Sequence, residues 1–223
     1  MRRVSRPGDM LSKVKVARLI QLLEDEYPKA LCALEYERDY ELLFAARLSA
    51  QCTDARVNLI TPVLFGRYPT LESLAGADVS ELEGIIHSCG FFRAKARDII
   101  AASAMLISEF GGHVPDTMDE LLRIPGVGRK TANLMLGDVH NKPAVVVDTH
   151  CIRLSNRIGL VSVKEPVKIE AELRRILPPE SSSDFCHRLV LHGRAVCTAR
   201  SPDCGACCVA EICARAGVGA VNS

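Results

Sequence analysis

The stretch that decides the fold is residues 124–150, which read IPGVGRKTANLMLGDVHNKPAVVVDTH. It opens with a loop, residues 124–128, whose two glycines allow a tight turn and a close approach to another group. A helix is predicted from Arg129 onward, and its first N–H groups and positive dipole end form an anion site suited to phosphate. Residues 118–123 (MDELLR) predict a short helix before the loop, so the segment indicates a helix-hairpin-helix motif that grips a nucleic-acid backbone through main-chain amides. The residues expected to contact DNA here are Gly126, Val127, Gly128 and Arg129.

Two residues of this stretch are candidates for chemistry. Lys130 lies in the first turn of the predicted helix, where the positive field favours a neutral amine, and a neutral amine can act as a nucleophile. Eighteen residues later, an apolar run ends at Asp148, which is either the N-cap of a following helix or an acid–base partner of Lys130. Taken from these residues alone, a solvated lysine and a purely capping aspartate remain the alternatives.

Length and composition indicate a folded protein rather than a disordered or membrane protein. The chain has 223 residues, of which 48% are hydrophobic and 25% are charged. Its longest apolar runs are too short to span a bilayer, and no signal-type apolar core follows Arg2, Arg3 and Arg6, so we expect a cytosolic protein whose first nine residues precede the fold. The net charge is only +1, so a basic surface must come from local arrangement of Lys and Arg.

The chain reads as a series of helices. Helical periodicity predicts helices at about 11–26, 40–50, 53–65, 81–88, 93–110, 151–159, 167–176 and 184–196, and no alternating pattern persists, so the fold class is all-α. Gln51 follows one of these helices as an ordinary polar residue or a contact residue. Phe91 and Phe92 adjoin at an interhelical turn and cannot both face one core, so one of them is either exposed as a wedge between base steps or placed in another part of the core.

Ten cysteines without a secretion signal point to metal rather than to disulfides. Six are scattered and are expected to be small buried side chains: Cys32, Cys52, Cys89, Cys151, Cys186 and Cys208. The other four have the spacing C-x6-C-x2-C-x5-C, a soft ligand set that suits zinc or an iron–sulfur cluster. These four are Cys197, Cys204, Cys207 and Cys213.

Three blocks of sequence resemble the endonuclease III family of DNA glycosylases. They are IPGVGRKTAN followed by VDTH, LSAQCTDARVN at residues 48–58, and the four-cysteine pattern preceded by LHGR. The resemblance implies two helical domains with the active site in the cleft between them. Residues 32–142 would form a six-helix barrel domain with the helix-hairpin-helix. Residues 1–31 and 143–223 would form a domain holding a [4Fe-4S] cluster on the four patterned cysteines.

The same resemblance implies a mechanism and a substrate. Lys130 would attack C1′ of an oxidised pyrimidine nucleotide such as thymine glycol, with Asp148 as the essential carboxylate, and the Schiff base would nick the strand 3′ to the abasic site. Gln51 would enter the gap left by the extruded base, and Phe91 or Phe92 would wedge the stack. The partner would be double-stranded DNA bound by a monomer, with His150 and Arg153 as further contacts.

Other functions fit the residues less well. The adenine glycosylase relative has serine at the position of Lys130 and a catalytic glutamate near Ala46. A non-catalytic DNA-binding protein would need neither Lys130 nor Asp148, and a small electron carrier would not need the large helical body. The loop between Cys197 and Cys204 carries only Arg200, opposed by Asp203, so a weaker phosphate contact is expected there.

Overall fold

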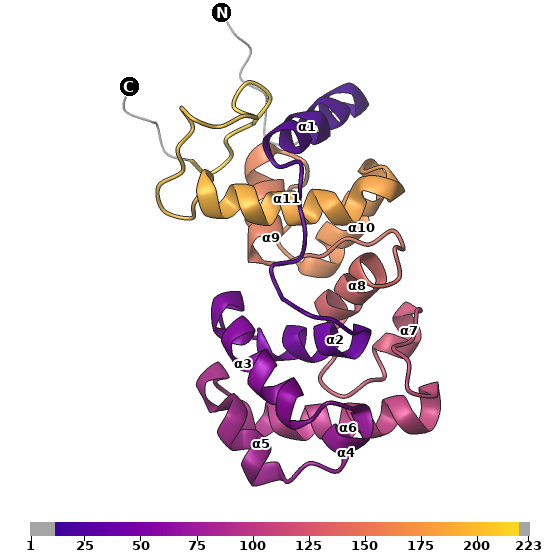
Figure 1. The fold of residues 1–223 in the computed structure, drawn as a ribbon. Helices are drawn as coiled ribbons and strands as arrows, with labels where there is room; N and C mark the ends of the chain where they lie inside the picture. The colour runs from indigo at the N-terminus through magenta and orange to yellow at the C-terminus, as the bar shows by residue number, and fades with distance from the viewer. Residues whose placement is uncertain (1–11, 219–223) are drawn as a thin grey trace, which may run out of the picture. The chain divides into compact units, whose positions relative to one another are not determined.

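The computed structural model describes residues 12–218, which fold as helices joined by loops (Figure 1). Within that range there is no strand, which confirms the all-α prediction. The predicted lead-in, residues 1–9, lies outside the described range. None of the helices in the described range has the length and apolar character needed to cross a membrane.

The chain divides into two compact units. We call Cys32–Asn141 the hairpin unit, and the described parts of Met1–Leu31 and Lys142–Ser223 the cysteine unit. The hairpin unit contains α2 (Asp39–Leu48), α3 (Asp54–Arg67), α4 (Leu71–Ala75), α5 (Val79–Ile86), the 3-10 turn η1 (His87–Cys89), α6 (Phe92–Phe110), α7 (Met118–Leu121) and α8 (Arg129–Asp138). The cysteine unit contains α1 (Lys13–Glu26), α9 (Thr149–Ile158), α10 (Pro166–Ile176), η2 (Pro179–Ser181) and α11 (Ser182–Ala195).

Helix α2 is the core of the hairpin unit. Its residues from Tyr40 to Ala46 and its last residue, Leu48, are buried, as expected of a helix that is apolar on most of its surface. Helices α3, α6 and α8 pack against it, while α6 also packs against α4 and α5. Helix α4 was not predicted from the sequence, because five residues are too few to show a helical period; Thr70 caps it by accepting from Ser73 N at 3.2 Å.

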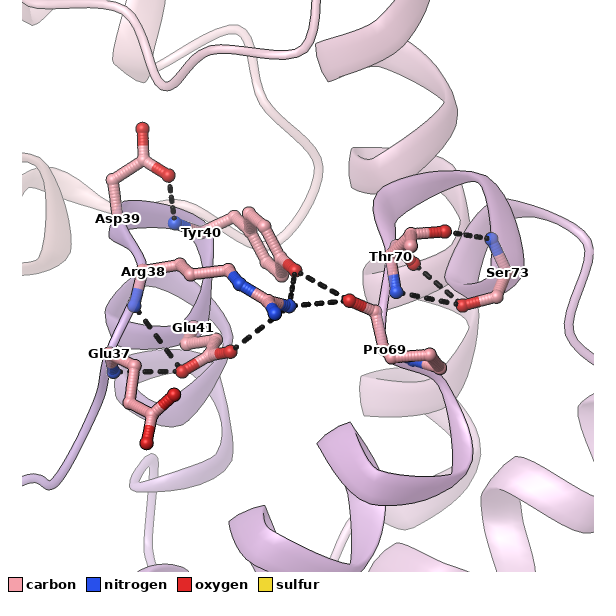
Figure 2. A network of polar contacts seen from close by, with 8 residues as sticks. All are labelled: Glu37, Arg38, Asp39, Tyr40, Glu41, Pro69, Thr70 and Ser73. Atoms are coloured by element: carbon pink, nitrogen blue, oxygen red, sulfur yellow. Dashed lines mark hydrogen bonds and ion pairs between the residues drawn. The ribbon is translucent and has the colours of Figure 1, made fainter.

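A polar network holds the beginning of α2 in place (Figure 2). The buried Glu41 carboxylate accepts from the backbone N–H groups of Glu37 at 2.8 Å and Arg38 at 3.3 Å. The Arg38 guanidinium donates to the hydroxyl of Tyr40 at 2.6 Å and to the carbonyl of Pro69, just before α4. These contacts hold the start of α2 against the turn between α3 and α4.

In the cysteine unit, α9 and α11 approach closely at Gly193. A Cβ atom there would lie 2.7 Å from Cδ2 of His150 and 2.8 Å from Nη2 of Arg153, so any larger residue would displace these two side chains. Helix α1 packs against α11, and its Leu19 and Leu23 side chains are fully buried. Tyr27, the C-cap of α1, lies against His192 in the last turn of α11, with ring centroids 5.9 Å apart.

Candidate active site and cysteine centre

The hairpin between α7 and α8 turns at a glycine where any larger residue would be strained. Gly126 has φ +77°, and a Cβ atom on it would lie 2.7 Å from Nε of Arg47 and 2.9 Å from Cβ of Asp98. Arg47, near the end of α2, donates from Nε to Oδ2 of Asp98 on α6 at 2.7 Å. Pro125 and Val127 line a small pocket with the same pair. The hairpin thus rests on an ion pair that joins α2 to α6.

The amides of the hairpin differ in what they can offer a phosphate. Val127 donates its N–H to the carbonyl of Ile124 at 3.1 Å, which closes the turn. In the part of the chain that the structure describes, the N–H groups of Gly126 and Gly128 donate to no other backbone carbonyl. Gly128 is the N-cap of α8 and has no side chain to satisfy that helix end. The amides of Gly126 and Gly128 therefore remain for an anion, and the Val127 amide does not.

Lys130 is the second residue of α8 and its side chain is exposed, as is that of Arg129. Both side chains extend from the N-terminus of α8, where the unpaired amides and the positive end of the helix dipole lie. The arrangement can hold a DNA phosphate and present a primary amine beside it.

Gln51 and Phe91 share an uncommon backbone conformation. Gln51 has φ +56° and Phe91 has φ +47°, both in the left-handed region, and both side chains are exposed, Phe91 to 66%. Phe92 instead packs on His87, with ring centroids 4.5 Å apart. The structure therefore separates the two adjacent aromatics: Phe91 points outward, and Phe92 packs against its neighbour.

Asp148 caps α9 in the cysteine unit. Its Oδ1 accepts from the backbone N–H of Cys151 at 2.7 Å, and its Oδ2 lies 3.1 Å from Nδ1 of His150. The preceding run, Val145–Val147, is buried, which anchors the carboxylate at the start of the helix. The predicted cap is confirmed. The second oxygen, Oδ2, lies beside His150, whose ring packs against Gly193.

Arg153 has a different setting from the one expected of a DNA contact. Its Nη2 donates to the carbonyls of Gly193 at 3.0 Å and Cys197 at 3.1 Å. Burial lowers the pKa of this guanidinium. The side chain joins α9 to the end of α11, so its predicted contact with DNA gains no support from this geometry.

The four patterned cysteines line one pocket, whereas Cys208 does not. No disulfide joins any of the ten cysteines, all of which lie in the described part of the chain. Of the six scattered ones, Cys89, Cys151 and Cys186 are buried as predicted, whereas Cys32, Cys52 and Cys208 are only half-buried, which corrects the prediction of buried side chains for these three.

The donor set fits an iron–sulfur cluster. Burial raises the pKa of Cys207 and of Cys213, and repulsion from the charges of the other patterned cysteines raises both further. Iron cations offset that repulsion, and four thiolates are the usual ligands of a [4Fe-4S] cluster. Among the described residues, no group of three or more His, Cys, Asp or Glu side chains is set to hold a single metal ion.

Three side chains that the sequence did not reveal support these sulfurs. His192, buried in α11, has Nε2 3.3 Å from Sγ of Cys207 and Nδ1 3.1 Å from the hydroxyl of Tyr27. Arg157 donates from Nη1 to Sγ of Cys197 at 3.5 Å. Hydrogen bonds to ligand sulfur orient the ligands and tune a cluster. The available sequence signal was the position of His192 in LHGR, just before Cys197.

Comparisons with known proteins agree with these two centres. Residues 44–179 match the family described as HhH-GPD superfamily base excision DNA repair protein, and residues 197–213 match the iron–sulfur binding domain of endonuclease III. The chain is 46% identical over 205 residues to endonuclease III of Synechocystis sp., covering 92% of this chain and 94% of that protein. It is 40% identical over 205 residues to endonuclease III of Bacillus subtilis, with the same two coverages.

Comparison with solved structures points to the same family. A solved structure of a trapped endonuclease III–DNA covalent intermediate superposes with a TM-score of 0.86 at 40% identity, covering 92% of this chain and 96% of that chain. The chain therefore belongs to the endonuclease III family of the HhH-GPD superfamily, and it is a DNA glycosylase and AP lyase of base excision repair that carries a [4Fe-4S] cluster.

Proposed function

We propose that this enzyme excises oxidised pyrimidines from double-stranded DNA with Lys130 as its nucleophile and Asp148 as its essential carboxylate. The observation that carries the proposal is the position of Lys130, exposed in the first turn of α8 directly after the hairpin glycines. An amine there lies beside the amides that would hold a backbone phosphate, and so within reach of the adjoining sugar.

The proposed reaction begins with a neutral Lys130 amine. The amine attacks C1′ of the damaged nucleotide, the bond from C1′ to the base breaks, and the base leaves with the bonding electrons and gains a proton. Asp148 accepts the proton that the amine loses and stabilises the positive charge that develops on the sugar.

Strand cleavage follows from the same covalent bond. Opening of the sugar ring gives a Schiff base between C1′ and Nζ of Lys130. Removal of a proton from C2′ then expels the phosphate from C3′ by β-elimination, which nicks the strand 3′ to the abasic site. Water hydrolyses the Schiff base and returns the free lysine. The similarity to an endonuclease III solved as a trapped covalent intermediate with DNA supports this route.

The substrate class follows from the cost of extrusion. A nucleotide must leave the stack to reach Lys130, at a cost of about a few kcal/mol that is lowest for badly stacked lesions. Thymine glycol has lost its aromatic planarity and stacks badly.

Six residues would contact the DNA in this proposal. Phe91 would wedge the stack from its exposed position, and Gln51 would fill the gap. The DNA backbone would be contacted by Gly126, Gly128, Arg129 and His150.

The proposal also covers the setting in which the enzyme acts. The Synechocystis and Bacillus relatives are bacterial proteins, and we propose a monomer that acts on chromosomal DNA in the cytoplasm. Light scattering of the purified protein, alone and with a lesion-bearing duplex, tests the monomer: a mass of one chain on one duplex is expected.

Borohydride trapping on a duplex with thymine glycol tests the mechanism. Borohydride reduces a Schiff base to a stable amine, so the wild-type enzyme should become covalently attached to DNA, and Lys130→Gln should not. Lys168→Gln is the matched control, because this exposed α10 lysine pairs with the exposed Glu165 and should leave the adduct unchanged. An adduct that persists in Lys130→Gln would overturn the assignment of the nucleophile.

A further inference from the structure

Lys95, in the first turn of α6, is a lysine with no exposed surface. Its Nζ donates to three backbone carbonyls, those of Leu48 at 2.8 Å, Ala50 at 2.8 Å and Cys89 at 2.9 Å. An ammonium group has three N–H donors, and here each has an acceptor. The buried charge is therefore satisfied by carbonyl dipoles.

The three carbonyls explain why a cation is stable at this place. Leu48 is the last residue of α2 and Cys89 is the last residue of η1, while Ala50 lies in the turn after α2. The last carbonyls of a helix have no partner within the helix and carry its negative dipole end, so a cation there is favourable. A lysine near the beginning of its own helix, α6, has no such benefit from that helix. Its position is accounted for by the ends of α2 and η1.

The residues that follow these carbonyls are the two predicted insertion residues. Gln51 directly follows Ala50, and Phe91 follows Cys89 after Gly90. Gln51 and Phe91 are two of only four non-glycine residues with positive φ in the described part of the chain. A left-handed conformation is unfavourable for a non-glycine residue and persists only where its surroundings hold it. The Lys95 ammonium group thus binds the backbone just before Gln51 and just before Phe91, the two residues with left-handed φ.

We propose that Lys95 is a positioning residue that sets the spacing of Gln51 and Phe91 by holding the ends of α2 and η1 on one ammonium group. The two side chains must act on the same base step, one in the gap and one in the stack, so their spacing decides whether the lesion can be extruded. This inference rests on the proposed roles of Gln51 and Phe91 in the lesion-bound complex. Because all three donors of Nζ are used by Leu48, Ala50 and Cys89, none is left for the hairpin that holds the phosphates.

Lys95→Met tests the proposal, because methionine has a similar length without the charge or the donors. Three quantities are measured: affinity for an undamaged duplex, the rate of thymine glycol excision in a single turnover, and the fluorescence of 2-aminopurine opposite the lesion, which rises when the local stack opens. We expect affinity within about twofold of wild type, excision slowed at least about tenfold, and loss of the fluorescence rise. Lys168→Met, at an exposed site, should match wild type in all three.

Two further results separate positioning from general loss of structure. If Lys95 acts through Phe91, the double variant Lys95→Met/Phe91→Ala should excise no slower than the slower single variant, within about twofold; multiplied effects would overturn the proposal. A loss of affinity in proportion to the loss of excision would also overturn it. Should Lys95→Met not fold, Lys95→Arg serves in its place, since a planar guanidinium cannot reproduce all three contacts.

These measurements separate failure of the Lys95 positioning role from failure of the proposed substrate. A wild-type protein that opens the stack in a Lys95-dependent way, yet excises no thymine glycol, would overturn the proposed substrate and leave the positioning role standing. Normal stack opening and excision in folded Lys95→Met would overturn the positioning role alone.

Discussion

Gly126 lies so close to Arg47 that a Cβ atom on it would be 2.7 Å from Nε of that arginine. Since Arg47 is held by Asp98 at 2.7 Å, the arginine cannot simply move away. Gly126→Ala should therefore suffer both strain from φ +77° and a steric clash. Gly112 has a similar φ of +82° with open space around it, so Gly112→Ala isolates the cost of the backbone conformation.

We expect Gly112→Ala to lower the free energy of unfolding by about 1–2 kcal/mol and Gly126→Ala to lower it by about a further 1–3 kcal/mol. Gly126→Ala should also weaken duplex binding, because the hairpin amides would shift. Denaturant unfolding and a binding titration of both variants check this. Equal stability of the two variants would show that the close approach to Arg47 has no energetic consequence.

Asp148→Asn separates the cap of α9 from the chemistry. Asparagine caps a helix about as well as aspartate, so the variant should keep the hydrogen bond from Cys151 N and unfold within about 1 kcal/mol of wild type. Excision should fall by about 10²–10⁴-fold, because the amide can neither accept a proton nor stabilise positive charge. Single-turnover excision and thermal unfolding, with Asp148→Ala as the variant that loses the cap as well, provide the measurement. Excision within tenfold of wild type would remove Asp148 from the catalytic group.

The two adjacent phenylalanines should respond in opposite ways to truncation. Phe91 is 66% exposed, so Phe91→Ala should change stability by less than about 0.5 kcal/mol while slowing excision. Phe92 packs on His87, so Phe92→Ala should cost about 1–2 kcal/mol, below the roughly 3–5 kcal/mol of a fully buried phenylalanine. Thermal melting and excision rates on both variants check this. A Phe92→Ala enzyme that folds normally but cannot excise would exchange the two roles.

His192 should protect the cluster through its contact with Cys207. His192→Leu removes the donor 3.3 Å from that sulfur and leaves the hydroxyl of Tyr27 without its partner, so the cluster should be lost faster under air or chelator. Tyr27→Phe should show the same change more weakly, since it removes only the support of the imidazole. Visible absorbance and iron content measured over time are the readouts. Cys208→Ser is the control and should keep the full iron content, because Cys208 does not line the pocket; loss of iron from it would require a different ligand set.

Local sequence patterns were sufficient for much of this protein. Helical periodicity predicted α6, α9, α10 and α11, and the cap at Asp148 followed from a carboxylate placed directly before a helix. The cysteine spacing singled out four side chains that the structure places around one pocket, and two glycines followed by basic residues predicted the hairpin. Each of these features depends on residues that lie close together in the sequence, so a short segment is enough to specify it.

Only the tertiary structure decided which side chains act together. Lys95 reaches Ala50 across 45 positions of sequence, and Tyr27 reaches His192 across 165. Arg153, predicted as a DNA contact, is directed at Gly193 and Cys197 by the same kind of long-range packing. The structure also decided that Phe91 is exposed while Phe92 packs on His87. A sequence pattern shows that a residue is polar, basic or aromatic. Which surface that residue meets depends on how helices far apart in the chain pack, and that is determined by burial of the whole core rather than by any one segment.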